Sequence, residues 1–214
     1  MRYPNFSEEK KLWKRGMRRV AGLDEAGRGP LSGPVFAAAV IVKKDRKLKL
    51  LRVNDSKKLS PKKREELYEI LIDHPKIKWG IAKVSEKVID RINILEATKL
   101  AMKRAVEKLK VKNRRRKIDF LILDGNFKID SSIPQKAIVK ADNKVFSCAA
   151  ASILAKVSRD RLMQRYDKKY PKYGFSKHKG YATKLHFKML ERYGPCKIHR
   201  KSFRPVSNLL SKKV

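Results

Sequence analysis

Acidic residues are scarce in this chain of 214 residues. It holds 21 Asp and Glu against 56 Lys and Arg, which gives a formal net charge of +35. Such an excess of positive charge repels itself and would hold phosphate backbones by releasing their counterions, so nucleic acid is the expected partner. The hydrophobic fraction of 42% still suffices for a globular core, so the charge by itself does not indicate disorder.

Cysteine and long apolar runs are scarce as well. The two cysteines, Cys148 and Cys196, are too few for a disulfide framework, which fits a reducing cytoplasm, the location we expect. Cys148 stands in an alanine run and is expected to be a small core residue. No apolar stretch approaches the length of a membrane span, and residues 1–19 contain no apolar signal-peptide segment. An anionic membrane is therefore the weaker alternative to nucleic acid.

Apolar runs and turn signals predict an α/β domain with a five-stranded mixed sheet flanked by helices. The strands are expected at residues 18–24, 34–42, 77–81, 118–124 and 136–140. The short link between the first two predicts an antiparallel pair, and crossovers add the last two strands to a three-stranded meander. From residue 169 onward, turn signals and helices indicate a small C-terminal helical subdomain. The predicted domains are therefore residues 1–168 and 169–214.

Capping signals place the helices. Ser7 can cap a short helix in residues 1–17, and Ser60 with Pro61 at the first helical position starts another. The buried face of that second helix is predicted to consist of Leu67, Ile70 and Leu71. Asn93 with Glu96 resembles a capping box, and residues 144–168 form a long helix whose small residues permit close packing. The basic run in residues 110–117 is either a phosphate contact or a solvated connection.

Four carboxylates stand at strand ends, where acid is otherwise rare. Asp24 and Glu25 end the first predicted strand, Asp124 ends the fourth before a glycine, and Asp142 follows the fifth. Parallel neighbouring strands would bring their carboxyl ends together, which is where open α/β sheets place their sites. Neighbouring acids repel one another unless a cation compensates them. The pattern predicts a cage for two divalent cations about 4 Å apart that cut a phosphodiester. The alternative for the first pair is a strand exit with solvated carboxylates.

At these residues the sequence resembles the ribonuclease HII family, the type 2 ribonucleases H, in its bacterial form. The matching segments, which follow the order found in that family, are Gly22-Leu23-Asp24-Glu25-Ala26-Gly27-Arg28-Gly29-Pro30, Asp55-Ser56-Lys57-Lys58-Leu59-Ser60, Leu123-Asp124-Gly125, Ala149-Ala150-Ala151-Ser152-Ile153-Leu154-Ala155-Lys156-Val157-Ser158-Arg159-Asp160, Tyr170-Pro171-Lys172-Tyr173-Gly174-Phe175, His178-Lys179-Gly180-Tyr181, Gly194-Pro195 and His199-Arg200-Lys201-Ser202-Phe203. Leu23 and Ser32 are conservative departures from the family pattern. The resemblance implies a ribonuclease H-like fold.

The resemblance also implies an activity and its metal ligands. It implies an endoribonuclease that cuts the RNA strand of RNA–DNA hybrids and nicks duplex DNA 5′ of an embedded ribonucleotide. The cofactor would be Mg²⁺ or Mn²⁺ at a two-metal site, and the products would carry 3′-hydroxyl and 5′-phosphate ends. Carried over to this chain, the metal carboxylates are Asp24, Glu25, Asp124 and Asp142.

Substrate contacts carry over in the same way. Gly27, Arg28 and Gly29 become the loop that recognises the ribonucleotide 2′-hydroxyl, and Tyr181 would stack on the sugar of the next nucleotide. A glycine-flanked turn lets main-chain groups approach the minor groove, where the 2′-hydroxyl distinguishes RNA from DNA. Lys57 is either a phosphate contact near the metals or a solvated lysine after a turn. The C-terminal subdomain would help to bind substrate, and the enzyme is expected to be a monomer.

Further basic and imidazole side chains have competing interpretations. Lys156, Arg159 and Arg161 can line a phosphate track, although Arg159 can equally pair with Asp160 or cover the core with its stem. The histidines His178, His186 and His199 lack zinc-site spacing, so packing or phosphate contact is favoured for them.

Two rival functions remain open from the sequence. One is a basic nucleic-acid-binding protein without catalysis, which the carboxylates argue against because a pure binder gains nothing from acid beside phosphate. The other is a two-metal nuclease with a different substrate, such as a DNA junction.

Overall fold

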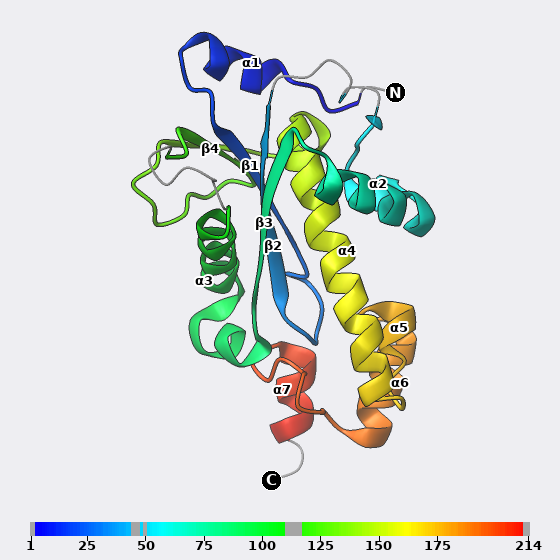
Figure 1. Ribbon diagram of the computed structural model, residues 1–214. Helices are drawn as coiled ribbons and strands as arrows, with labels where there is room; N and C mark the ends of the chain where they lie inside the picture. The colour runs from blue at the N-terminus through cyan, green and yellow to red at the C-terminus, as the bar shows by residue number, and fades with distance from the viewer. Residues whose placement is uncertain (1–2, 44–47, 49–50, 110–116, 212–214) are drawn as a thin grey trace.

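The computed structural model of the protein describes residues 3–43, 48, 51–109 and 117–211 (Figure 1). Within them lie the strands β1 (Val20–Ala26), β2 (Val35–Val42), β3 (Ile77–Val84), β4 (Phe120–Asp124) and β5 (Gln135–Ile138). They form a sheet in the order β3-β2-β1-β4-β5. The first three strands pair antiparallel, and β4 runs parallel to both β1 and β5. The predicted five-stranded mixed sheet is confirmed, whereas the basic run at 110–116 lies outside the described residues.

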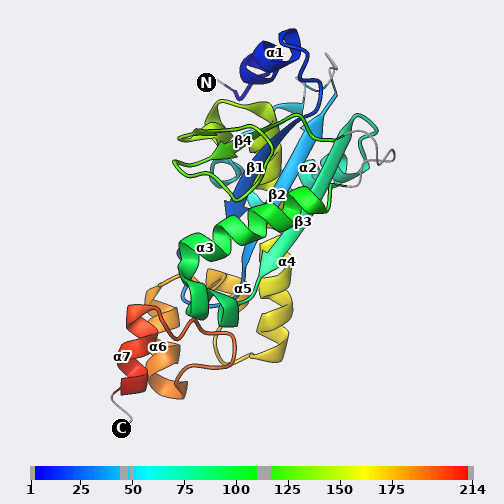
Figure 2. The same ribbon diagram turned by 90° about the vertical axis from the view of Figure 1, so that its left-hand side faces the viewer.

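Strand β2 shows why the central apolar run has no polar alternation. Ala38, Val40 and Val42 pack into a core cluster on one face of the sheet, and Ala37 and Ile41 pack into a second cluster on the other. Helix α4 (Phe146–Lys169) covers the first face, together with α2 (Pro61–Asp73) (Figures 1 and 2). Helix α3 (Glu86–Glu107) covers the second. Both faces are buried, so every position of β2 must be apolar.

Close packing of α4 on β1 fixes the centre of the molecule. A Cβ atom at Gly22 would lie 2.3 Å from the Oγ atom of Ser147 and 2.6 Å from the main-chain nitrogen of Cys148, so only glycine fits there. The alanines at 149–151 and Cys148 are fully buried at this contact. The predictions that small residues bring the long helix close and that Cys148 is a core residue are confirmed.

One prediction about the first two helices holds and two are wrong. Ser60 caps α2 by accepting a hydrogen bond from the main-chain N–H of Lys63, as predicted. Ile70, in contrast, is 40% exposed and does not belong to the buried face. Ser7 is not the cap of α1 (Ser7–Lys14), because the side chain of Asn5 accepts the main-chain N–H of Ser7 instead.

Helix α3 begins seven residues before the predicted capping box. Asn93 lies inside it with a φ of 63°, which breaks the helix, and its side-chain oxygen accepts the main-chain N–H groups of Leu95 and Glu96. The capping role of Asn93 is therefore confirmed, but it caps only the second half of a kinked helix. The first half starts at Glu86.

The C-terminal segments are helical, as predicted, and contact the end of α4. They comprise α5 (Phe175–His178), α6 (Lys184–Tyr193) and α7 (Arg204–Ser211). Met163 of α4 shares an apolar cluster with Tyr173 and Phe175, and Leu31 of the β1–β2 link shares another with Val206. The boundary after residue 168 stays a prediction. Among the described helices, none combines the length and the apolar character needed to cross a bilayer.

Candidate metal centre

Three aspartates meet where β1 and β4 end side by side. We call Asp24, Asp124 and Asp142 the acidic triad: each offers a carboxylate oxygen, and these oxygens lie within 4.8 Å of one another. Parallel pairing of Leu23 with Leu123 places Asp24 and Asp124 one residue further along at the same sheet edge. Asp142 comes from the 3₁₀ turn η3 (Ala141–Asn143), whose Ala141 N–H donates a 2.6 Å hydrogen bond to the Asp124 carboxylate.

Glu25 and the acidic triad line one hollow in the surface, but the Glu25 carboxylate is not part of the triad. One of its oxygens is 3.6 Å from the guanidinium of Arg28, and the other, Oε2, is buried with no hydrogen-bond partner among the described residues. Three of the four predicted carboxylates are thus brought together, and the fourth is adjacent with an unsatisfied oxygen. An unsatisfied buried carboxylate oxygen is costly unless a further group reaches it.

Burial and mutual repulsion raise the pKa values of all four acids. Burial raises the pKa of Asp24 well above its usual range, and Glu25 and Asp124 add to the effect. The pKa of Glu25 is raised to about 7, mainly by burial and against the opposing charge of Arg28. Burial is also the largest cause of the raised pKa values of Asp124 and Asp142. In a chain with a net charge of +35, this local excess of negative charge needs a cation.

The donor set fits a hard divalent cation. Convergent carboxylate oxygens, buried and repelling one another, are the ligands that Mg²⁺ and Mn²⁺ prefer. The orphaned Glu25 Oε2 atom offers a further oxygen ligand on the same wall. The structure therefore supports the interpretation of these acids as metal ligands over that of a solvated strand exit.

The predicted substrate residues line the same hollow, which has a volume of about 260 Å³. They are Gly27, Arg28, Gly29, Lys57 and Tyr181. Two serines that the sequence did not single out lie there as well. Ser56 and Ser152 are hydrogen-bonded at 2.9 Å, and Ser152 also hydrogen-bonds to Asp24.

Asp55 organises the turn that carries Lys57 and was also missed. Its carboxylate accepts the main-chain N–H of Lys57 at 2.9 Å and so caps the turn η2 (Ser56–Lys58). Burial alone would lower the pKa of Lys57, but Asp55, Asp24 and Asp142 outweigh it and raise that pKa. Lys57 thus stays charged beside the acids, where a phosphate contact is available to it.

Only glycine fits at the first position of the glycine-arginine-glycine loop, residues 27–29. Gly27 has a φ of +96°, and a Cβ atom there would lie 2.1 Å from the Arg159 side chain. At Gly29 nothing stands within 4 Å of such a Cβ atom, so that side of the loop is open. Arg28 is partly exposed and lies over the ring of Phe127. All three residues of the loop line the hollow, and the Arg28 side chain lies between Glu25 and the ring of Phe127 at its edge.

Two buried arginines hold the link between β1 and β2, which contains this loop, through its main-chain carbonyls. Arg200 donates to the carbonyl oxygens of Gly27, Arg28 and Gly33 at 2.5 to 3.0 Å. Arg159 donates to those of Ser32, Pro34 and Lys179.

The prediction of a phosphate contact at Arg159 is wrong, because its side chain is fully buried among carbonyls. It also makes no ion pair with Asp160 among the described residues, since Asp160 binds Lys156. Arg161 is bound to Glu65 and Glu69 and lies over the ring of Tyr68, which leaves Lys156 as the member of the predicted track that lines the site.

Tyr181 is positioned through its main chain by a histidine cluster. His186 Nδ1 lies 2.9 Å from the Tyr181 carbonyl oxygen, and the N–H of Tyr181 donates to the carbonyl of His178. His178 and His186 stack with ring centres 4.3 Å apart, and His186 Nε2 lies 3.0 Å from His199 Nε2. All three rings are buried, so the prediction that they pack is confirmed. The Tyr181 ring stays 39% exposed at the hollow.

Comparison with known proteins decides the family. The ribonuclease HII profile matches residues 21–206, which contain every predicted site residue. This chain belongs to the ribonuclease HII family. It is 53% identical to ribonuclease HII of Caldicellulosiruptor bescii over 207 residues, 96% of this chain and 95% of that protein.

Solved structures of ribonuclease HII have the same fold. Ribonuclease HII of Archaeoglobus fulgidus, in its complex with PCNA, superposes with a TM-score of 0.73 at 30% identity over 89% of this chain and 96% of that one. Ribonuclease H2 of Pyrococcus horikoshii gives 0.71 at 29% identity, over 91% and 98%. The protein is accordingly a metal-dependent endoribonuclease of the ribonuclease H type that cleaves the RNA strand of RNA–DNA hybrids. The rival interpretation of a binder without catalysis is thereby rejected.

Proposed function

We propose that this ribonuclease HII also nicks duplex DNA 5′ of a single embedded ribonucleotide, with Mg²⁺ or Mn²⁺ at a two-metal site. The observation that carries the proposal is that the acidic triad and the loop at residues 27–29 line one hollow. In this proposal the loop that recognises ribose lies directly beside the carboxylates that would hold the metal. Such an enzyme would act in the removal of ribonucleotides from DNA.

The metal ligands in this proposal are Asp24, Asp124, Asp142 and Glu25. When bound, the cations would activate a water and stabilise the leaving oxygen, which yields 3′-hydroxyl and 5′-phosphate ends. The chain's own contribution is the placement of these carboxylates. The Ala141 N–H holds the Asp124 carboxylate, and Ser152 holds that of Asp24. Both contacts orient the acids before substrate arrives.

Recognition of the ribonucleotide falls to the loop and to Tyr181. The main chain at Gly27, Arg28 and Gly29 can donate to and accept from a 2′-hydroxyl, which deoxyribose lacks. Tyr181 supplies a flat, half-exposed ring for stacking on the next sugar. Lys57 would hold a phosphate close to the metals. The enzyme is proposed to act as a cytoplasmic monomer.

The test compares three labelled duplexes: DNA with one ribonucleotide, an RNA–DNA hybrid, and DNA alone. With Mg²⁺ or Mn²⁺ we expect one nick 5′ of the ribonucleotide, many cuts in the hybrid and none in plain DNA. Cleavage of the hybrid without any nick at the single ribonucleotide would remove the finer activity and leave the family activity intact. Cleavage of plain DNA or of DNA junctions would instead favour a nuclease with another substrate.

A further inference from the structure

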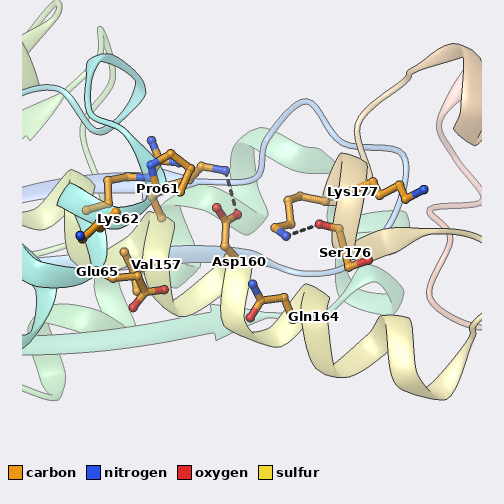
Figure 3. A pocket seen from close by; sticks show the side chains of 11 residues that line it. Pro61, Lys62, Glu65, Val157, Asp160, Gln164, Ser176 and Lys177 are labelled. Atoms are coloured by element: carbon orange, nitrogen blue, oxygen red, sulfur yellow. Dashed lines mark hydrogen bonds and ion pairs between the residues drawn. The ribbon is translucent and has the colours of Figure 1, made fainter.

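A second hollow opens beside the metal centre, between α2, α4 and α5 (Figure 3). We call it the basic groove, and its volume is about 480 Å³. Its basic wall residues are Lys62, Arg64, Lys156, Lys177 and Lys179. Lys156 lines both hollows, and its Nζ atom lies 5.7 Å from the centre of the Tyr181 ring. The basic groove therefore leads directly away from the candidate active site.

The two acids of the groove are already neutralised. Asp160, which lies between the two ends of the groove in Figure 3, is paired with Lys156 at 2.8 Å. Glu65 is bound by Arg161, which is not part of the groove wall, at 2.5 Å. Neither carboxylate is left to repel an anion at full strength, so the remaining cations determine the character of the groove.

Those cations are of two kinds. Arg64 is held in place by the carbonyl oxygens of Ser56 and Leu59 and, among the described residues, forms no ion pair. Lys62 and Lys177 are exposed, and within the described part of the chain neither makes an ion pair. They lie toward opposite ends of the groove in Figure 3. The groove thus combines one cation held by main-chain carbonyls with two exposed lysines.

The first turn of α2 adds to this positive field. Pro61 begins the helix in the groove wall, so the positive end of the α2 dipole faces the same space. Lysine is a point charge that binds phosphate without reading sequence. The chemistry of the wall therefore matches a row of backbone phosphates rather than a base or an apolar ligand.

We propose that the basic groove binds the sugar-phosphate backbone of the duplex substrate beyond the cleavage site. The proposal rests on the proposed function, because it takes a duplex cut at the acidic triad as the occupant. Lys156, at the boundary of the two hollows, connects the cleavage site to the groove. Lys62 and Lys177 bind phosphates further along the same backbone.

The test measures binding without divalent cation, by fluorescence anisotropy of a DNA duplex with one ribonucleotide, across a range of salt concentrations. The variant is Lys62→Ala combined with Lys177→Ala. Each lost phosphate contact should reduce the slope of log Kd against log salt by about 0.9, so the double variant should lose about 1.8. Its kcat at saturating substrate should stay at the wild-type value while KM rises.

The matched control replaces two exposed lysines at the ends of α3, on the opposite face of the sheet. It is Lys87→Ala combined with Lys108→Ala, which removes the same charge. The control should keep the wild-type salt slope. An equal loss of slope in the control, or an unchanged slope in the groove variant, would overturn the proposal.

Duplex length gives a second, independent readout. Shortening the duplex on one side of the ribonucleotide should abolish the difference between wild type and groove variant, and shortening on the other side should preserve it. Equal effects from both sides would contradict a groove on one side of the cut. If wild type cleaves the single-ribonucleotide duplex but the groove variant binds normally, only the groove proposal fails. If wild type does not nick that duplex, the proposed function fails.

Discussion

Arg200 donates a 2.7 Å hydrogen bond to the main-chain carbonyl of Arg28, a residue 172 positions earlier in the chain. The same guanidinium binds the carbonyls of Gly27 and Gly33. Burial lowers its pKa to about 9, so it remains charged at neutral pH. A charged side chain beneath the loop thus fixes the carbonyls that flank the proposed 2′-hydroxyl contact.

Replacing Arg200 should therefore damage recognition as well as stability. Arg200→Met leaves several buried carbonyl oxygens without donors, and each such group costs about 1–3 kcal/mol of unfolding free energy. We expect urea unfolding at lower denaturant and a larger fall of kcat/KM on the single-ribonucleotide duplex than on the RNA–DNA hybrid. Lys201→Met, at the exposed neighbouring position, is the control. Equal losses on both substrates would show that Arg200 serves stability alone.

Asp124→Asn should abolish cleavage while leaving substrate binding intact or tighter. The substitution removes one metal ligand and also one negative charge that repels phosphate, so we expect kcat to fall to the background rate. Cleavage and anisotropy on the same duplex measure both effects. Retained activity would exclude Asp124 from the metal centre.

Divalent cations should stabilise the folded wild-type protein. The raised pKa of Glu25, about 7 against 4.5 when unfolded, means that this group's contribution to stability is present below pH 4.5 and is lost as pH rises through 7. Above pH 7 the charge of Glu25 adds to the repulsion among the acids, and Mg²⁺ or Mn²⁺ should raise Tm. Asp124→Asn should melt higher than wild type without metal and gain less from it. An identical Tm gain in both proteins would argue that the cation binds elsewhere.

Acid should destabilise the histidine cluster. Burial lowers the pKa values of His186 and His199 to about 4, so the unfolded state binds protons first. Stability from these groups is complete above pH 6.5 and falls as the pH drops toward 4, by about 1.4 kcal/mol per pH unit for each proton. Between pH 6.5 and pH 4, the unfolding free energy of His199→Gln should fall less steeply than that of wild type. Equal slopes for the two proteins would contradict this assignment.

The Tyr181 ring should contribute more to the recognition of an embedded ribonucleotide than to the affinity for duplex DNA in general. Tyr181→Ala should lower kcat/KM on the single-ribonucleotide duplex, with little change in Kd for plain DNA. Tyr181→Phe keeps the ring and should behave like wild type. An equal loss of affinity for the single-ribonucleotide duplex and for plain DNA would assign the ring to general binding only.

The carboxylates at the strand ends were predictable because they obey local rules. Asp24 and Asp124 each follow an apolar run and precede a glycine turn. Parallel pairing of their strands then brings the two carboxylates to the same edge of the sheet. Asp142 was placed after the fifth strand, but the turn η3 that presents it carried no signal of its own. Glu25 was grouped with them from adjacency, whereas the structure pairs it with Arg28.

The burial of Arg200 was not predicted from the sequence, and that of Arg159 was only one alternative among three. Arginine is ordinarily exposed, and the burial of Arg159 and Arg200 depends on carbonyls that converge only after the β1–β2 link folds over α4. The start of α3 was missed for a different reason. Ser85 makes no side-chain cap, while Asn93 supplies a strong capping signal within the helix.

In the proposed function the acidic triad holds metal beside the loop that contacts the 2′-hydroxyl. The most direct measurement is the anomalous scattering of Mn²⁺ in crystals of the protein with a duplex that contains one ribonucleotide. We expect manganese density among Asp24, Asp124 and Asp142, with the 2′-hydroxyl against residues 27–29. Manganese bound away from these aspartates, or a 2′-hydroxyl that faces away from the loop, would contradict the account.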